Sequence, residues 1–205
     1  MFDLPFQKYS VILADPPWQF QTWSEKGRDR CPDNKHYQTM SIVDIVNLKN
    51  NVRLISTKDC ALFMWSTWPM LNQALHVMLQ WGFIYKTCAF CWMKGYSNDD
   101  LWKGNGYWTR ANTEFCLLGT RGKPKRKSRD VPQAILEPRR EHSRKPDITY
   151  EYIERLLSGP YVELFARQRR IGWDAWGNEI DKFSRKNPAG VMRQGLESRD
   201  PTPLG

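Results

Sequence analysis

The chain has 205 residues, enough to form one domain with a sizeable hydrophobic core, and a formal net charge of +9. This charge favours a polyanionic partner. An odd number of cysteines, five, argues against a disulfide-rich secreted scaffold, and no apolar stretch approaches the length of a membrane span. We therefore expect a cytoplasmic protein with no membrane partner.

The first predicted strand is followed by the most informative motif of the sequence. Residues 9–14 are an apolar run that is typical of a buried strand, and Asp15-Pro16-Pro17-Trp18 comes directly after it. The two prolines end the strand because they fix φ and lack a backbone donor. An acid and a large aromatic side chain are thus presented at the carboxyl end of a strand, where open α/β sheets bind ligands.

This motif is suited to methylation of an exocyclic base amine, which is a poor nucleophile because its lone pair is delocalised into the ring. Asp15 and a carbonyl of Pro16 or Pro17 could each accept one N–H and favour the reactive, tetrahedral nitrogen. Trp18 could stack on the base, which is worth about 1–3 kcal/mol. An activated methyl on a sulfonium needs positioning and electrostatics more than a metal ion. The alternative is structural: a turn with a packed tryptophan.

The rest of the chain alternates between predicted helices and strands. A polar loop over residues 19–40 is a candidate lid, and Ser41 to Asp44 resembles a capping box that opens a short helix to about residue 47. The pattern predicts strands and helices in this order: strand 61–65, helix 68–81, strand 83–93, a loop over 95–112, strand 114–119, a helix from 146 and strand 161–166. This order predicts an α/β sheet with helices on both faces, formed by residues 1–181, with a polar tail over 182–205.

Positive charge is concentrated between residues 121 and 145, where ten Lys or Arg and three acids give +7 of the total +9. We predict that this segment binds the phosphates of a nucleic acid through Lys123, Lys125, Arg126, Lys127 and Arg129. The alternative is a solvated basic loop without a partner. Cys88 and Cys91 have no second Cys or His pair at zinc spacing, so no metal site is predicted.

These motifs together resemble a family of N6-adenine methyltransferases. It includes the catalytic subunit of the messenger-RNA adenosine methyltransferase and bacterial and phage DNA-modifying members. The resemblance covers roughly residues 9–181 and is strongest at 14–18, 37–41, 106–108, 114–119, 143–147, 163–167 and 177–179. Two positions depart from the family pattern: Ala166 replaces a glycine and Arg144 replaces a histidine.

The resemblance implies a Rossmann-like fold with the catalytic motif ahead of the cofactor-binding strand, and S-adenosylmethionine as the cofactor. Asp15 and Pro16 resemble the catalytic pair, within a motif completed by Pro17 and Trp18. Further residues resemble groups that line the target adenosine (Tyr37 and Glu114) or hold the cofactor (Asp15, Lys145, Arg167, Asn178 and Glu179). Glu163, near the end of a strand, could also bind hydroxyl groups.

The implied function is transfer of a methyl group from S-adenosylmethionine to N6 of adenine in nucleic acid, by a monomer or homodimer. DNA is favoured because this small chain looks more like a bacterial or phage member than a eukaryotic subunit. The alternatives are an RNA methyltransferase and a catalytically inactive nucleic-acid-binding subunit. Retention of the Asp15–Trp18 motif argues against the inactive subunit, and its first residue argues against cytosine N4, where Ser is more common.

Overall fold

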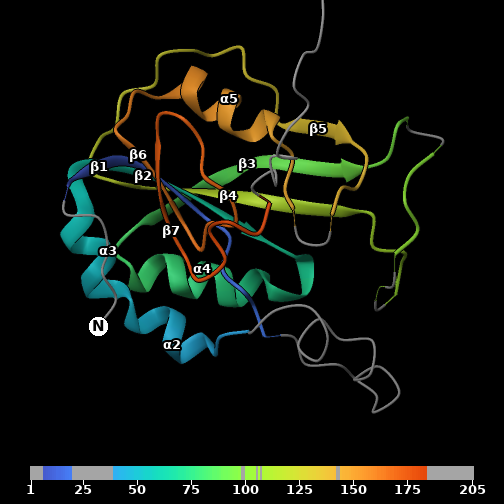
Figure 1. Ribbon diagram of the computed structural model, residues 1–205, viewed down its shortest axis with the longest axis horizontal. Coiled ribbons are helices and arrows are strands. Elements are labelled where there is room, and N and C mark those ends of the chain that lie inside the picture. The colour runs from blue at the N-terminus through green and yellow to red at the C-terminus, as the bar shows by residue number, and fades with distance from the viewer. Residues whose placement is uncertain are drawn as a thin grey trace, which may run out of the picture.

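A seven-stranded sheet forms the centre of the structure, a computed structural model that describes residues 7–19, 39–97, 100–104, 106, 108–141 and 144–183 (Figure 1). The strands lie in the order β5-β3-β4-β2-β1-β6-β7. Their bounds are β1 (Tyr9–Ala14), β2 (Ser56–Ser66), β3 (Ile84–Lys94), β4 (Thr113–Arg121), β5 (Ala134–Glu137), β6 (Tyr161–Leu164) and β7 (Trp173–Trp176). The helical segments are α2 (Ile42–Asn47), α3 (Lys49–Ile55), the 3-10 helix η2 (Trp68–Met70), α4 (Leu71–Gln80) and α5 (Ile148–Leu156).

The directions of the strands determine which of their ends share an edge of the sheet. β1 pairs in parallel with β2 and β6, and β6 pairs in parallel with β7. β4 runs antiparallel to its neighbours β2 and β3, whereas β3 and β5 are parallel. The carboxyl ends of the other six strands therefore lie at the same edge as the amino end of β4. We call this edge the rim.

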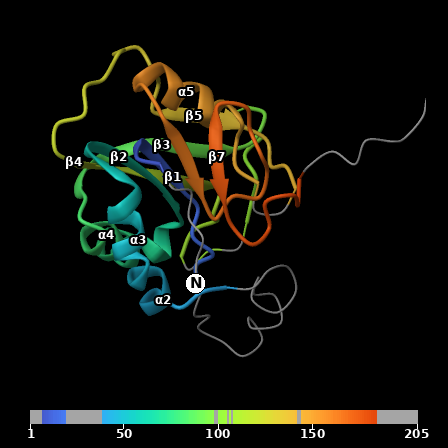
Figure 2. The same ribbon diagram turned by 60° about the vertical axis from the view of Figure 1, so that its left-hand side comes forward.

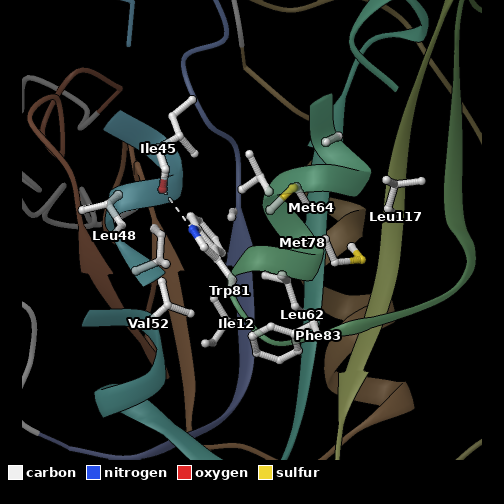
Figure 3. Close-up of a cluster of buried hydrophobic side chains, with 14 of the residues drawn as sticks. Ile12, Ile45, Leu48, Val52, Leu62, Met64, Met78, Trp81, Phe83 and Leu117 are labelled. Carbon is white, nitrogen blue, oxygen red and sulfur yellow. Dashed lines mark hydrogen bonds between the residues drawn. The ribbon is translucent and has the colours of Figure 1, made fainter. Parts of the chain in front are cut away.

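Helices cover both faces of the sheet, as Figures 1 and 2 show. On one face, α2, α3 and α4 contribute Ile45, Val52 and Val77 to the larger of two buried clusters (Figure 3). The indole N–H of Trp81 donates to the carbonyl of Ile45 at 2.9 Å and so ties the end of α4 to α2. On the other face, α5 buries Ile153 in the second cluster. Full burial of side chains of this size stabilises the fold by about 1.5–3 kcal/mol each.

The predicted capping box at the start of α2 is confirmed. The hydroxyl of Ser41 accepts a hydrogen bond from the backbone N–H of Asp44 at 3.1 Å and donates one to the Asp44 carboxylate at 2.7 Å. The first bond satisfies a backbone N–H that the first turn of a helix leaves unpaired, and the second orients the Ser41 hydroxyl. The helix ends at Asn47, as predicted, and Leu48 joins it directly to α3, which the sequence pattern does not predict.

The predicted Rossmann-like α/β fold with helices on both faces is confirmed, and β1 precedes β6 in the chain. The strand expected over residues 161–166 ends at Leu164, because Phe165 takes a left-handed backbone conformation with φ of 62°. Most of the predicted lid (20–38) and tail (184–205) lies outside the described residues. Among the residues that are described, no helix is long and apolar enough to cross a membrane.

Candidate active site

Five strands bring charged side chains together at the rim. Asp15 follows β1, Arg167 lies just after β6 and Glu179 lies after β7. Lys94 is the last residue of β3, and Glu114 is the second residue of β4. Because β4 is antiparallel, its amino end meets the carboxyl ends of the other strands, so residues distant in sequence converge here.

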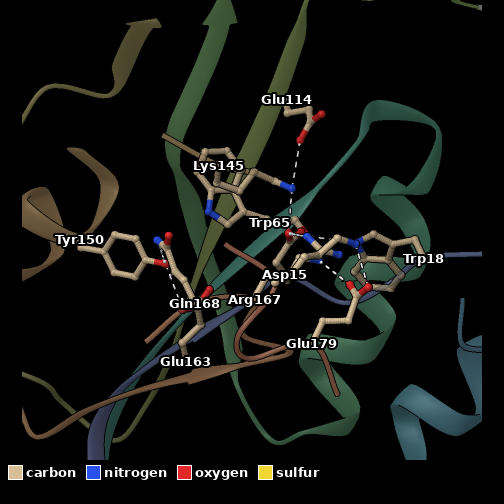
Figure 4. Close-up of polar contacts among 11 residues, drawn as sticks. Asp15, Trp18, Trp65, Glu114, Lys145, Tyr150, Glu163, Arg167, Gln168 and Glu179 are labelled. Carbon is tan, nitrogen blue, oxygen red and sulfur yellow. Dashed lines mark hydrogen bonds and ion pairs between the residues drawn. The ribbon is translucent and has the colours of Figure 1, made fainter. Parts of the chain in front are cut away.

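These side chains form one continuous chain of alternating charges through Lys145, and Figure 4 shows the part of it from Glu114 to Glu179. Lys94 Nζ lies 2.5 Å from a carboxylate oxygen of Glu114, whose other oxygen lies 3.4 Å from Lys145 Nζ. Lys145 Nζ lies 2.8 Å from Asp15 Oδ2, and Arg167 Nη1 lies 2.8 Å from the same oxygen. Arg167 Nε continues the chain to Glu179 at 3.4 Å.

Asp15 lies at the centre of this chain and is 8% exposed. Both cations donate to its Oδ2, and among the described residues no hydrogen bond reaches Oδ1. A carboxylate oxygen has more than one acceptor position, and charge-assisted bonds of this kind hold the group in a fixed orientation. The carboxylate is therefore oriented through one oxygen and has the other available to accept a hydrogen bond from a ligand.

The charge chain determines the protonation of Glu114 and Lys145. Burial alone would raise the pKa of Glu114, but the ammonium groups of Lys145 and Lys94 lower that pKa to about 2. Burial alone would lower the pKa of Lys145, but the carboxylates of Asp15 and Glu114 raise it above its usual value. Each group therefore holds its neighbour in the charged form at neutral pH.

The Pro-Pro elbow is fixed by its backbone carbonyls. Pro16 O accepts from the N–H of Trp18 at 2.8 Å, and Pro17 O accepts from the N–H of Met40 at 2.9 Å. Trp18 itself is 4% exposed, belongs to the larger core cluster and donates its indole N–H to Trp65 O at 3.0 Å. In this structure Trp18 thus anchors the elbow in the core, and its ring does not present an open stacking surface.

Glu163 lies at the floor of the site, one residue before the end of β6. It is 9% exposed, and its carboxylate accepts a hydrogen bond from the Tyr150 hydroxyl at 2.9 Å. Burial raises the pKa of Glu163 to about 7; the hydrogen bond from Tyr150 opposes this effect, and the nearby charge of Asp15 adds to it. Burial and the neighbouring Glu163 likewise raise the pKa of Tyr150 well above its usual value.

Two cavities share Phe165 and Arg167 in their walls, and Asp15 lines the smaller of them. The smaller has a volume of about 20 Å³ and is lined by Asp15, Lys145, Tyr150 and Glu163, among others. The larger has a volume of about 740 Å³, and its wall includes the predicted cofactor residues Asn178 and Glu179. This volume lies within the range of about 300–1,000 Å³ that is usual for small-molecule sites.

Most of the residues predicted from the sequence meet at this site. The exceptions are the five basic residues Lys123, Lys125, Arg126, Lys127 and Arg129. They follow β4, whose last residue Arg121 pairs with Cys60 near the start of β2, so they lie toward the edge opposite the rim. The backbone N–H of Lys123 is held there by Asp59 at 2.7 Å. Tyr37 lies outside the described residues.

Two members of the site were not identified from the sequence. Lys94 directly follows the predicted strand 83–93, so the argument that placed Asp15 at a strand end could have found it. Tyr150 lies on the buried side of α5 together with Thr149 and Ile153. The spacing of apolar residues in the sequence suggests a slightly different buried face, which does not include Tyr150. Its contact with Glu163 depends on the way α5 packs on the sheet, and nothing in the local sequence signals it.

Comparison with known proteins identifies a matching family and several relatives of this chain. Residues 9–179 match the MT-A70 family. The chain is 34% identical to M.MunI, a type II methyltransferase of a Mycoplasma species, over 86% of this chain and 80% of the relative. It is 27% identical to the N(6)-adenosine-methyltransferase subunit METTL3 of Danio rerio and 28% identical to an MT-A70-like N(6)-adenosine-methyltransferase of Arabidopsis thaliana.

The lengths of these relatives differ. The two adenosine methyltransferases match over 91% and 93% of this chain, but the chain spans only 30% and 26% of their own lengths. The strand ends at the rim carry a motif of an acid, two prolines and an aromatic residue, which is typical of a methyltransferase that acts on an amine of a nucleic acid. The region that matches the family includes both the rim and this motif. The chain belongs to the MT-A70 family, which confirms the resemblance seen in the sequence.

Proposed function

We propose that this protein transfers a methyl group from S-adenosylmethionine to N6 of adenine in DNA. The observation that carries the proposal is the state of Asp15: Lys145 and Arg167 orient its carboxylate through Oδ2, and Arg167 also lines a cavity large enough for a cofactor. The family of the chain and the names of its relatives support the same reaction.

The residues around the larger cavity fit S-adenosylmethionine, which supplies an activated methyl group on a sulfonium when bound. The amide of Asn178 can donate to and accept from ribose hydroxyls, and the carboxylate of Glu179 can accept from them. Arg167 lies where the two cavities meet, and with Lys145 it supplies positive charge for the carboxylate of the cofactor. Glu163 adds a second group that can bind hydroxyls or an ammonium.

The adenine amine is activated by acceptors on this chain. Asp15 Oδ1 accepts one N–H of the amine, and a carbonyl of the Pro16-Pro17 elbow, which has one acceptor position in use, accepts the other. The nitrogen lone pair is then directed away from both acceptors, which favours its reaction with the activated methyl group that the cofactor would supply. The carboxylate of Asp15 can receive the proton that the amine loses. Positioning and electrostatics supply most of the catalysis.

DNA is the favoured substrate because the chain is 34% identical to the type II methyltransferase, compared with 27% and 28% for the two adenosine methyltransferases. RNA is the second candidate, since the names of those longer relatives specify adenosine. The net charge of +9 suits either polyanion.

The test is incubation of the purified protein with isotopically labelled S-adenosylmethionine and either unmethylated DNA or RNA, followed by mass spectrometry of the nucleosides. We expect label in N6-methyl-2′-deoxyadenosine. Label in N4-methylcytosine, or in neither nucleic acid, would overturn the proposal, and label in RNA adenosine alone would select the second candidate.

Asp15→Asn tests the role of the carboxylate in the same assay. The amide keeps the shape of the side chain but accepts hydrogen bonds without a full negative charge, so turnover should fall at least ~100-fold. Binding of S-adenosylhomocysteine, measured by calorimetry, shows whether the variant retains its cofactor cavity. Near-normal turnover in Asp15→Asn would remove Asp15 from the mechanism.

A further inference from the structure

The larger cavity has a second set of polar residues, contributed by α2 and α3. Asn47 ends α2 and Asn51 lies in α3, and both line the cavity with Leu48 between them. They belong to two different helices, which Leu48 joins directly. Asn47 is exposed and Asn51 is half-buried; the neighbouring Asn50 is exposed as well but does not line the cavity.

The two amides have no established structural task. Within the described part of the chain, neither Asn47 nor Asn51 makes a side-chain hydrogen bond, whereas the nearby Asp44 is engaged with Ser41 at the start of α2. Leu48, which joins the two helices, is 3% exposed and belongs to the larger core cluster. Its packing therefore holds both helices against the sheet. The amides are therefore presented on a fixed wall.

Cavity sizes determine which end of the cofactor faces this wall. The methyl group must be delivered beside Asp15, where the two cavities meet at Arg167 and Phe165. The smaller cavity, about 20 Å³, has room for about one water molecule and cannot hold a purine. Of these two cavities, the larger is the one with room for the adenosine end of the cofactor, and Asn47 and Asn51 help to form its wall.

We propose that Asn47 and Asn51 recognise the adenine ring of the cofactor. An adenine edge places the N6 donor beside a ring-nitrogen acceptor, and a carboxamide offers the complementary acceptor and donor. Neither Asp44 nor Glu179, the acidic residues in the same wall, can donate to a ring nitrogen when ionised. The two amides thus select adenine over a purine that has only hydrogen at position 6, because such a purine leaves the amide oxygen without a donor. This assignment rests on the proposed function, because it requires an adenosine cofactor in the cavity.

The test is calorimetric titration of the full chain with S-adenosylhomocysteine and with the analogue in which hydrogen replaces the 6-amino group of its purine. We expect the wild type to prefer the adenine form. Asn47→Ala and Asn51→Ala should each weaken its binding about 2- to 10-fold, the range for loss of one or two hydrogen bonds. The double variant should lose most of the preference for adenine. Asn50→Ala is the matched control and should bind as the wild type does.

Each outcome has a separate meaning. If the wild type binds S-adenosylhomocysteine and the double variant keeps the same affinity and preference as Asn50→Ala, this assignment is wrong and the proposed function stands. If the wild type binds neither ligand, the proposed function fails and the assignment fails with it. Asn51→Asp, which keeps the size of the side chain but removes its donor, should weaken binding to a similar extent. Thermal unfolding of every variant shows that the change lies in the cavity and not in the fold.

Discussion

A carboxylate that is 8% exposed loses most of its hydration, and Asp15 compensates for this loss through Lys145 and Arg167. Glu163, another acid at the same rim, has a different environment. Its hydrogen-bond partner among the described residues is the neutral hydroxyl of Tyr150. Burial therefore leaves Glu163 with a pKa near 7, while Asp15 has two cations within hydrogen-bond distance. Local partners, and not residue type, decide which acid can serve as a fixed negative charge.

Glu163 should make the stability of the protein depend on pH. Its pKa is raised from 4.5 in the unfolded chain to about 7 in the fold, so its contribution is fully present below about pH 4.5 and is lost as pH rises through 7. Glu163→Gln stays neutral and removes this dependence. Between pH 4.5 and pH 8, the free energy of unfolding of the wild type should fall relative to that of the variant by about 3 kcal/mol. Urea denaturation of both proteins at each pH measures this difference, and an equal offset at the two pH values would contradict the raised pKa.

At the scale of elements, the sequence predicts well where a local signal exists. The apolar run before Asp15 and the capping box at Ser41 each specify an element boundary through their own residues. The strands β5 and β7 have four residues each, and their pairing to β3 and β6 holds them in place. Strand propensity in such short segments depends on the neighbours that they pack against, which the local sequence does not contain.

The site follows the same rule. Asp15 could be predicted because the chemistry of its motif is local, and Glu114 and Lys145 could be predicted from a family resemblance. The hydrogen bond from Met40 to the carbonyl of Pro17 and the burial of Trp18 could not be predicted. They depend on Met40 and Trp65, which other parts of the chain bring next to the elbow. The sequence suggested a stacking role for Trp18 because it could not show how deeply the ring is packed.

Gly177 shows how closely two elements approach at the cofactor cavity. A Cβ at this position would lie 2.7 Å from both the nitrogen and the oxygen of Ala166, which are backbone atoms that cannot easily move. Gly177→Ala should therefore destabilise the fold by about 1–3 kcal/mol and also weaken binding of S-adenosylhomocysteine, since Ala166 and Gly177 both line the cavity. Denaturant unfolding and calorimetry measure the two effects.

Gly172→Ala is the control for that experiment. Gly172 has φ of 83°, which an alanine adopts at a cost of roughly 1–2 kcal/mol, but its added Cβ would meet no atom within 4 Å. It should lower stability and leave cofactor affinity unchanged. If Gly177→Ala also left the affinity unchanged, the close approach at Ala166 would have no part in forming the cavity.

On the scale of the whole molecule, positive charge is divided between two edges of the sheet. The segment 123–129 begins beside the Arg121–Cys60 pair, which lies five positions before Trp65 along β2, or about 16 Å from the rim. Exposed cations also lie at the rim itself, at Lys103, Arg110 and Arg139. The guanidinium of Arg139 lies 4.0 Å from the centre of the Trp102 ring, so it has an aromatic neighbour on which a base could stack.

A target adenine has to reach Asp15, so the nucleic acid that carries it should cross the rim. Changing Lys103, Arg110 and Arg139 to Gln should reduce the slope of log K against log salt concentration by about 2–3 in magnitude. Each phosphate that is no longer neutralised accounts for about 0.9 of this change. Changing Lys123, Lys125, Arg126, Lys127 and Arg129 to Gln removes more charge but should reduce the slope by less than about 1, because those residues lie toward the other edge. Binding of duplex DNA across a salt series, with S-adenosylhomocysteine present, compares the two variants. A larger effect of the five-residue change would show that the nucleic acid continues around the sheet to segment 123–129, the role that the sequence alone suggests for it.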